Sequence, residues 1–62
     1  MTITKVQLAL SVKQTAEALS IGTSKVYQMV ASGELPHIRI GGSVRIPTEA
    51  LRSWVQERQE QR

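Results

Sequence analysis

The run of residues 36–47, PHIRIGGSVRIP, constrains the fold more than any other part of the chain. Two short stretches rich in β-branched residues flank consecutive glycines, a pattern typical of two strands joined by a tight turn. Pro36 stands at the start of the first stretch, where a missing backbone amide is tolerated. The sequence therefore predicts a short β-hairpin in the second half of the chain.

The length of the turn decides which side chains share a face, because directly opposed residues in an antiparallel pair do so. A turn of Gly41 and Gly42 alone would oppose a charged residue to an apolar one. A turn that adds Ser43 opposes like to like, and we expect this three-residue loop, with a glycine at the position of positive φ. The expected pairs are Ile40 with Val44, Arg39 with Arg45, and Ile38 with Ile46.

In that register Arg39 and Arg45 face each other on the outer side of the hairpin. Like charges directly opposite are destabilising. Either an anion such as phosphate lies between them, or both side chains splay into solvent, where screening makes the repulsion cheap. These two residues alone leave both interpretations open.

Residues 11–19, SVKQTAEAL, have the pattern of a helix. Ser11 and Gln14 form an S-x-x-Q capping box, and Val12, Ala16 and Leu19 recur at the spacing of one buried stripe. The residues before it alternate loosely, which fits either a short strand or an unstructured lead over residues 1–9.

A second helix is predicted over residues 23–32, TSKVYQMVAS, with a left-handed cap at Gly33. Val26, Met29 and Val30 give its inward stripe. Between the two helices we expect Gly22 to sit where the chain bends sharply. Two short helices joined by about three residues that include glycine are typical of a helix-turn-helix.

A third helix is predicted from residue 48 onward, entered through Pro47. Its buried stripe is expected to be Leu51, Trp54 and Val55, with Trp54 as a core anchor rather than a stacking platform for bases. Residues 56–62 form a polar tail. The fold class is thus a small α+β winged helix-turn-helix, in the order helix, helix, two-stranded hairpin, helix, in a single domain over residues 1–62.

The composition argues against an enzyme. The chain has 62 residues and no cysteine, and its acidic residues are five scattered glutamates. So short a domain encloses no deep substrate pocket, and without cysteine there is no disulfide, zinc-thiolate site or thiol nucleophile. His37 is expected to face outward from the first strand, and it has no partner for catalysis or metal binding. We expect no catalytic residue, no metal and no cofactor.

We also expect no targeting signal, because Lys5 interrupts the first apolar stretch. We therefore expect no contact with membranes and a location in the cytoplasm.

Nucleic acid fits the remaining features better. The net charge is +3, and residues 23–46 carry two of these three positive charges. The first turn of the second helix of a helix-turn-helix meets base edges in the major groove, while a side-chain-poor hairpin tip can approach the minor groove or the backbone. Tyr27 can either bond a phosphate or pack half-buried. The candidate residues for binding double-stranded DNA are Thr23, Ser24, Lys25, Tyr27, Gln28, Arg39, Gly42, Ser43 and Arg45.

Residues from about Leu10 to Val55 resemble the excisionase-type DNA-binding domain, a relative of the MerR-like winged helices. The resemblance is carried by SVKQTAEAL, KVYQMVASGELP, RIGGSVRIP and a last helix with Leu51 and Trp54. Many relatives carry an arginine near the start of the second helix, which is their recognition helix, and a more basic tip on the hairpin, which is their wing. This chain departs from the family at both places, which implies that a single copy binds DNA with low affinity.

That resemblance implies a recombination directionality factor of a mobile genetic element. Such a protein binds and bends attachment-site DNA, associates cooperatively with further copies, and helps an integrase to excise the element. While bound to DNA it is associated with the nucleoid. A small transcriptional regulator built on the same domain is the alternative. A protein-interaction module that uses Trp54 and the last helix is a third.

Overall fold

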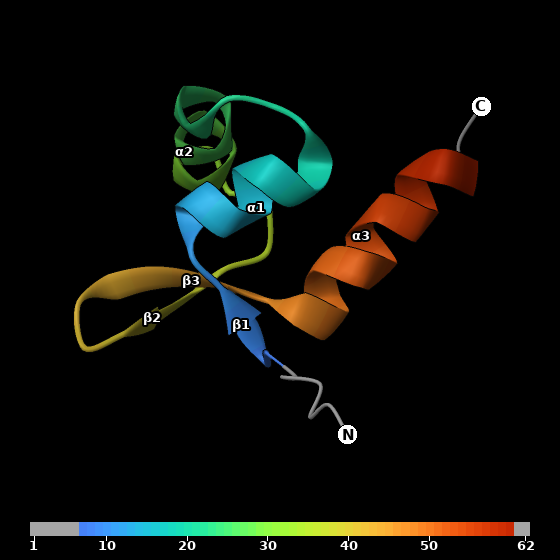
Figure 1. The fold of residues 1–62 in the computed structure, drawn as a ribbon. Coiled ribbons are helices and arrows are strands. Elements are labelled where there is room, and N and C mark those ends of the chain that lie inside the picture. Colours follow the sequence, from blue (N-terminus) through green and yellow to red (C-terminus); the bar gives the residue numbers. More distant parts are fainter. Residues whose placement is uncertain (1–6, 61–62) are drawn as a thin grey trace, which may run out of the picture.

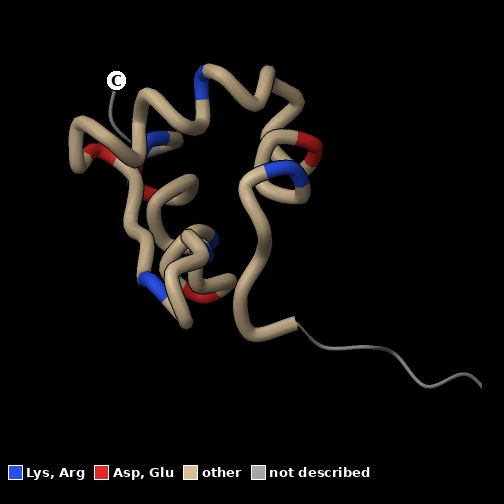
Figure 2. Tube along the Cα trace, turned by 90° about the vertical axis from the view of Figure 1, so that its left-hand side faces the viewer, with Lys and Arg blue, Asp and Glu red and all other residues tan. Residues whose placement is uncertain are grey.

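The computed structural model describes residues 7–60 as three helices and a three-stranded antiparallel sheet (Figure 1). The fold class is therefore α+β, as predicted. Figure 2 shows the chain from the side on which the second helix and the free end of the hairpin lie. The elements in chain order are β1 (Ala9–Leu10), α1 (Val12–Leu19), α2 (Thr23–Ala31), β2 (Ile38–Ile40), β3 (Ser43–Pro47) and α3 (Thr48–Glu60).

The capping box at the start of α1 is confirmed. The Ser11 hydroxyl accepts from the Gln14 amide at 3.1 Å, and the Gln14 side chain accepts from the Ser11 amide at 3.0 Å. Two amides that the helix itself leaves without partners are thereby satisfied.

The bend between α1 and α2 is made by Ser20, which takes the left-handed conformation at φ 59°. Gly22, which we expected at the sharp bend, instead has the extended values φ −77° and ψ 156° and serves as the N-cap of α2. That prediction was wrong, because the backbone bonds that close α1 require the positive φ two residues earlier: the Ile21 amide donates to the Ala16 carbonyl at 2.9 Å.

The C-terminal end of α2 has the cap that the sequence predicts. Gly33 lies at φ 82°, and the amides of Gly33 and Glu34 donate back to Val30 and Met29 at 3.1 and 3.0 Å. This is the Schellman arrangement, which glycine favours because it has no Cβ to clash.

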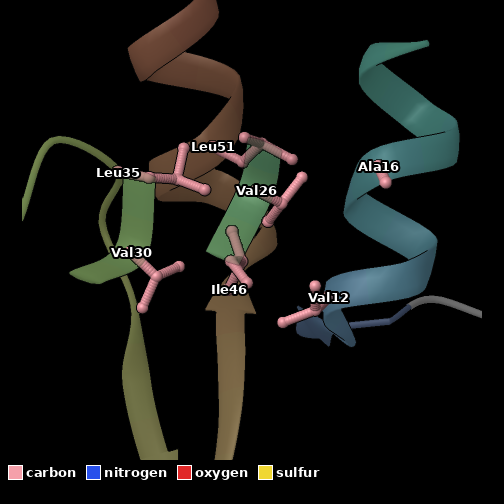
Figure 3. Close-up of a cluster of buried hydrophobic side chains, with 7 residues drawn as sticks. All are labelled: Val12, Ala16, Val26, Val30, Leu35, Ile46 and Leu51. Atoms are coloured by element: carbon pink, nitrogen blue, oxygen red, sulfur yellow. The ribbon is translucent and has the colours of Figure 1, made fainter. Parts of the chain in front are cut away.

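The core gathers side chains from all three helices, from β3 and from the connection before β2 (Figure 3). Val26, Leu35 and Ile46 are 0% exposed. Thr15 is equally buried, because its hydroxyl donates to the Ser11 carbonyl at 2.9 Å and leaves no polar group unsatisfied. The seven core residues are Val12, Ala16, Val26, Val30, Leu35, Ile46 and Leu51.

The hairpin register is not the predicted one. Its turn consists of Gly41 and Gly42, at φ 56° and 87°, and positive φ at both central residues is what a two-residue type I′ turn requires. Arg39 and Arg45 therefore do not face each other. The observed pairs are Ile38 with Arg45, Arg39 with Val44, and Ile40 with Ser43.

This register follows from where the hairpin lies. All three residues of β2 are exposed, and Ile46 at the base of β3 is the hairpin residue that is fully buried. A strand that projects beyond the core has no buried face to penalise mixed pairs, so turn geometry sets the register instead. Arg39 shares a face with Val44, whereas Arg45 lies on the opposite face with Ile38.

The lead before α1 forms part of the sheet. Leu10 pairs with Ile46 across β1 and β3 and packs against the core. Thr48 holds the preceding residues, since its amide donates to the Leu8 carbonyl at 2.9 Å and its hydroxyl to the Gln7 carbonyl at 2.6 Å. Residues 1–6 of the predicted lead lie outside the described part of the chain.

Trp54 borders the core rather than forming its centre. It is partly buried, and its indole nitrogen donates to the Glu34 carbonyl at 3.0 Å. Arg58 lies over its ring, 4.3 Å from the centroid, and pairs with the Glu34 carboxylate. Val55, expected in the buried stripe, is 39% exposed and lines a hollow between α1 and α3.

Candidate nucleic-acid interface

The N-terminal half of α2 presents polar side chains to solvent. Residues four apart share a helix flank, and so do residues three apart, so Thr23 and Tyr27 lie on one flank while Lys25 and Gln28 lie on another. Ser24 is also exposed, and Tyr27 is 58% exposed. The half-buried packing considered for Tyr27 is therefore not what the structure shows.

The first turn of α2 also offers backbone donors. Its N-cap, Gly22, has no side chain and makes no side-chain capping bond. The first amides of a helix have no partners within it, and in α2 they stay open to an acceptor. Amides at a helix N-terminus attract anions such as phosphate.

A groove of about 460 Å3 separates α2 from the hairpin. Figure 2 looks onto the side where these two elements lie. Three parts of the chain contribute to it: the start of α1, one residue of α2, and the hairpin from its turn into β3. The lining residues are Ser11, Val12, Lys13, Tyr27, Gly42, Ser43, Val44 and Arg45. The helix and the hairpin that the sequence singled out thus border a common groove.

Charge in the groove has one sign. Lys13 and Arg45 are its ionisable lining residues apart from the tyrosine, and no acidic side chain lines it. Within residues 7–60, the one ion pair joins Arg58 to Glu34, so neither groove cation is neutralised by a carboxylate. The Arg45 guanidinium folds back on its own strand, with Nη1 donating to the Val44 carbonyl at 2.8 Å.

Lys13 was missed in the sequence, where it belongs to the solvent face of the first helix. It reaches this groove because Leu10 pairs with Ile46 in an antiparallel ladder, which sets the start of α1 beside the residues of β3 that precede Ile46. A firm prediction of β1 from the sequence would have placed Lys13 beside the hairpin.

The predicted site residues divide between the groove and its surroundings. Tyr27, Gly42, Ser43 and Arg45 meet in the lining. The others are exposed on the same two elements: Thr23, Ser24, Lys25 and Gln28 on α2, and Arg39 on β2. Since Arg39 is opposite Val44, it shares the face of the hairpin from which that lining residue projects.

His37, expected on the outward face of the strand, is half-buried. Its Nδ1 lies 3.1 Å from the Leu35 carbonyl. The part of the chain from residue 7 to 60 contains no cluster of three or more His, Cys, Asp or Glu residues that could hold a metal ion. No helix within those residues is long and apolar enough to cross a membrane.

Comparison with known proteins places this chain in a family. The model of a helix-turn-helix domain matches residues 9–59. An excisionase of Streptomyces ambofaciens is 38% identical over 48 residues, which cover 77% of each chain. A probable excisionase of Saccharopolyspora erythraea is 42% identical over 45 residues, which cover 73% of this chain and 46% of that protein.

No solved structure matches the chain. The family resemblance drawn from the sequence is confirmed by the domain model and by both relatives, which match across most of its length. The chain belongs to the helix-turn-helix domain family, as an excisionase-like, non-catalytic DNA-binding protein.

Proposed function

We propose that this protein is an excision factor that binds specific sites in double-stranded DNA, bends that DNA and turns a partner integrase toward excision. The two relatives that match most of the chain are named an excisionase and a probable excisionase. Binding of further copies beside the first is part of the proposal, because the wing carries few cations and a single copy would hold DNA weakly. The proposed place of action is the cytoplasm.

The contacts on the bases come from α2. Lys25 and Gln28 share an exposed flank, and Ser24 lies next to it. In the major groove glutamine can pair with adenine through two hydrogen bonds, and lysine favours guanine or a phosphate. Thr23 lies in the uncapped first turn, where backbone amides add phosphate contacts.

The hairpin supplies the second contact. A turn of Gly41 and Gly42 has no side chain to hold it away from DNA, and Ser43 follows it directly. Arg39 is exposed on the face that Val44 shares. We assign this hairpin to the neighbouring minor groove or to the backbone beside it.

The observation that carries the proposal is the shared groove. Tyr27 of α2 and the turn of the hairpin line the same hollow, so one duplex can touch both elements at once. Had they bordered different sides of the molecule, the two elements could not contact the same duplex.

The test is a gel-shift titration with duplexes from the attachment region of the mobile element and with shuffled duplexes, at about 50 mM salt, where phosphate contacts are strongest. We expect replacement of Lys25 and Gln28 by alanine to weaken binding to the true site more than to the shuffled duplex. Each good bidentate base contact is worth about 1–3 kcal/mol of discrimination.

Equal weakening on both duplexes would show that α2 does not read bases, and no binding at low salt would remove DNA from the proposal. Excision is then measured with the integrase present. A protein that binds a promoter and leaves excision unchanged would be a transcriptional regulator instead.

A further inference from the structure

We infer that the groove between α2 and the hairpin holds the sugar–phosphate strand of the bound duplex, and that Lys13 of α1 is a phosphate ligand in it. This inference rests on the proposed function and adds a third contact element. It assigns a role to a residue outside both the recognition helix and the wing.

The major and minor grooves of a duplex that lie side by side are separated by one sugar–phosphate strand. A protein with α2 in one and a hairpin in the other must straddle that strand. The hollow of about 460 Å3 between these elements is the space in which the strand would lie.

Lys13 contributes a positive charge from the helix side of the groove and Arg45 from the hairpin side. The tyrosine hydroxyl of Tyr27 and the hydroxyl of Ser43 can each donate a hydrogen bond to a phosphate oxygen. No carboxylate lines the groove, so nothing there repels an anion.

Lys13 is exposed and takes part in no ion pair within residues 7–60. Its ammonium group can therefore turn to a phosphate without breaking an existing bond. A lysine free of such partners lies beside this groove because β1 pairs with β3 and holds the start of α1 there.

The experiment compares two variants of the full chain, Lys13→Gln and Arg52→Gln. Each removes one positive charge from an exposed side chain. Arg52 is a matched control because it lines a different hollow, between α1 and α3, which shares no residue with this one. Thermal melts first establish that both variants fold like the parent.

Binding to a mixed-sequence duplex is then measured from about 50 to 200 mM salt. Loss of one phosphate contact lowers the slope of log affinity against log salt by about 0.9. We expect that change for Lys13→Gln, with the greater loss of affinity at low salt, and a smaller one for Arg52→Gln. A mixed-sequence duplex suffices because phosphate contacts carry no sequence information.

Equal slopes for the two variants would overturn the inference while leaving the proposed function intact, since the parent protein still binds. If the parent itself fails to bind any duplex at low salt, the proposed function is wrong and the inference falls with it. The behaviour of the parent thus separates the two failures.

Discussion

The helix pair and the hairpin reach the same groove but owe their shapes to different forces. In the helix pair, Val26 is 0% exposed and Ala16 is 3% exposed, so burial of side chains holds it together. In the hairpin, Ile38 and Ile40 are 44% and 56% exposed, and the chain reverses because two glycines accept positive φ. One contact element therefore depends on packing and the other on backbone conformation, and each can be broken without the other.

The largest effect is expected in the buried core. Leu35 is 0% exposed and belongs to the segment of the chain that connects α2 to β2. Leu35→Ala removes buried methyl groups and leaves a cavity, which costs about 2–5 kcal/mol. Since the free energy of unfolding of native proteins is only about 5–15 kcal/mol, we expect a large fall in the urea midpoint, measured by circular dichroism.

The matched control is Leu8→Ala, at a leucine that is 82% exposed. Its midpoint should stay near that of the parent. If the two leucine variants unfold at the same urea concentration, the assignment of the core is wrong.

An intermediate effect is expected in the turn of the hairpin. A Cβ at Gly42 would meet no atom within 4 Å, but its φ of 87° is one that L residues rarely adopt. Gly42→Ala should therefore cost about 1–2 kcal/mol as backbone strain rather than as a clash. Amide hydrogen exchange should quicken in β2 and β3 while α1 and α2 keep their protection.

Gly42→Asn provides the comparison, because asparagine tolerates the left-handed region better than alanine. It should lie between the parent and the alanine variant. Uniform loss of protection across both helices would mean that hairpin and helix pair are not separable in this way.

The smallest effect is expected at the two helix starts, one capped by Ser11 and the other by Gly22. Serine caps better than glycine by a few tenths of a kcal/mol, roughly. Gly22→Ser should stabilise the domain by about that amount and Ser11→Gly should destabilise it similarly, measured as urea midpoints at a common slope. Shifts of the same sign would contradict the difference between the two caps.

The helices were predictable because their signals are local. The capping box of Ser11 and Gln14 and the cap at Gly33 each depend on a few adjacent residues. Core membership was harder to predict. Thr15 completes the buried stripe of α1 but is polar, and its burial depends on a hydrogen bond to the backbone. Leu35 lies outside any periodic segment, so periodicity gave no signal for it.

The site was predictable to a lesser degree for a related reason. The register of the hairpin was misjudged because pairing by polarity assumes a buried face, which β2 lacks. Lys13 was missed because its position depends on a strand of two residues, Ala9–Leu10, found through its partner far along the chain. The register of the hairpin and the position of Lys13 both depend on contacts, present or absent, between segments that are distant in the sequence.

Strand β2 is at the outer side of the sheet, whose order is β1-β3-β2. Such a strand can recruit a foreign strand and start aggregation, and a central charge is one way in which proteins prevent this. Arg39 stands between the two exposed isoleucines of β2. Its charge therefore protects the strand from pairing with a foreign strand, and the same side chain is a candidate DNA ligand. Replacing Arg39 by alanine removes both the protecting charge and the DNA contact. Replacing it by lysine keeps the charge on the strand and changes only the contact with DNA.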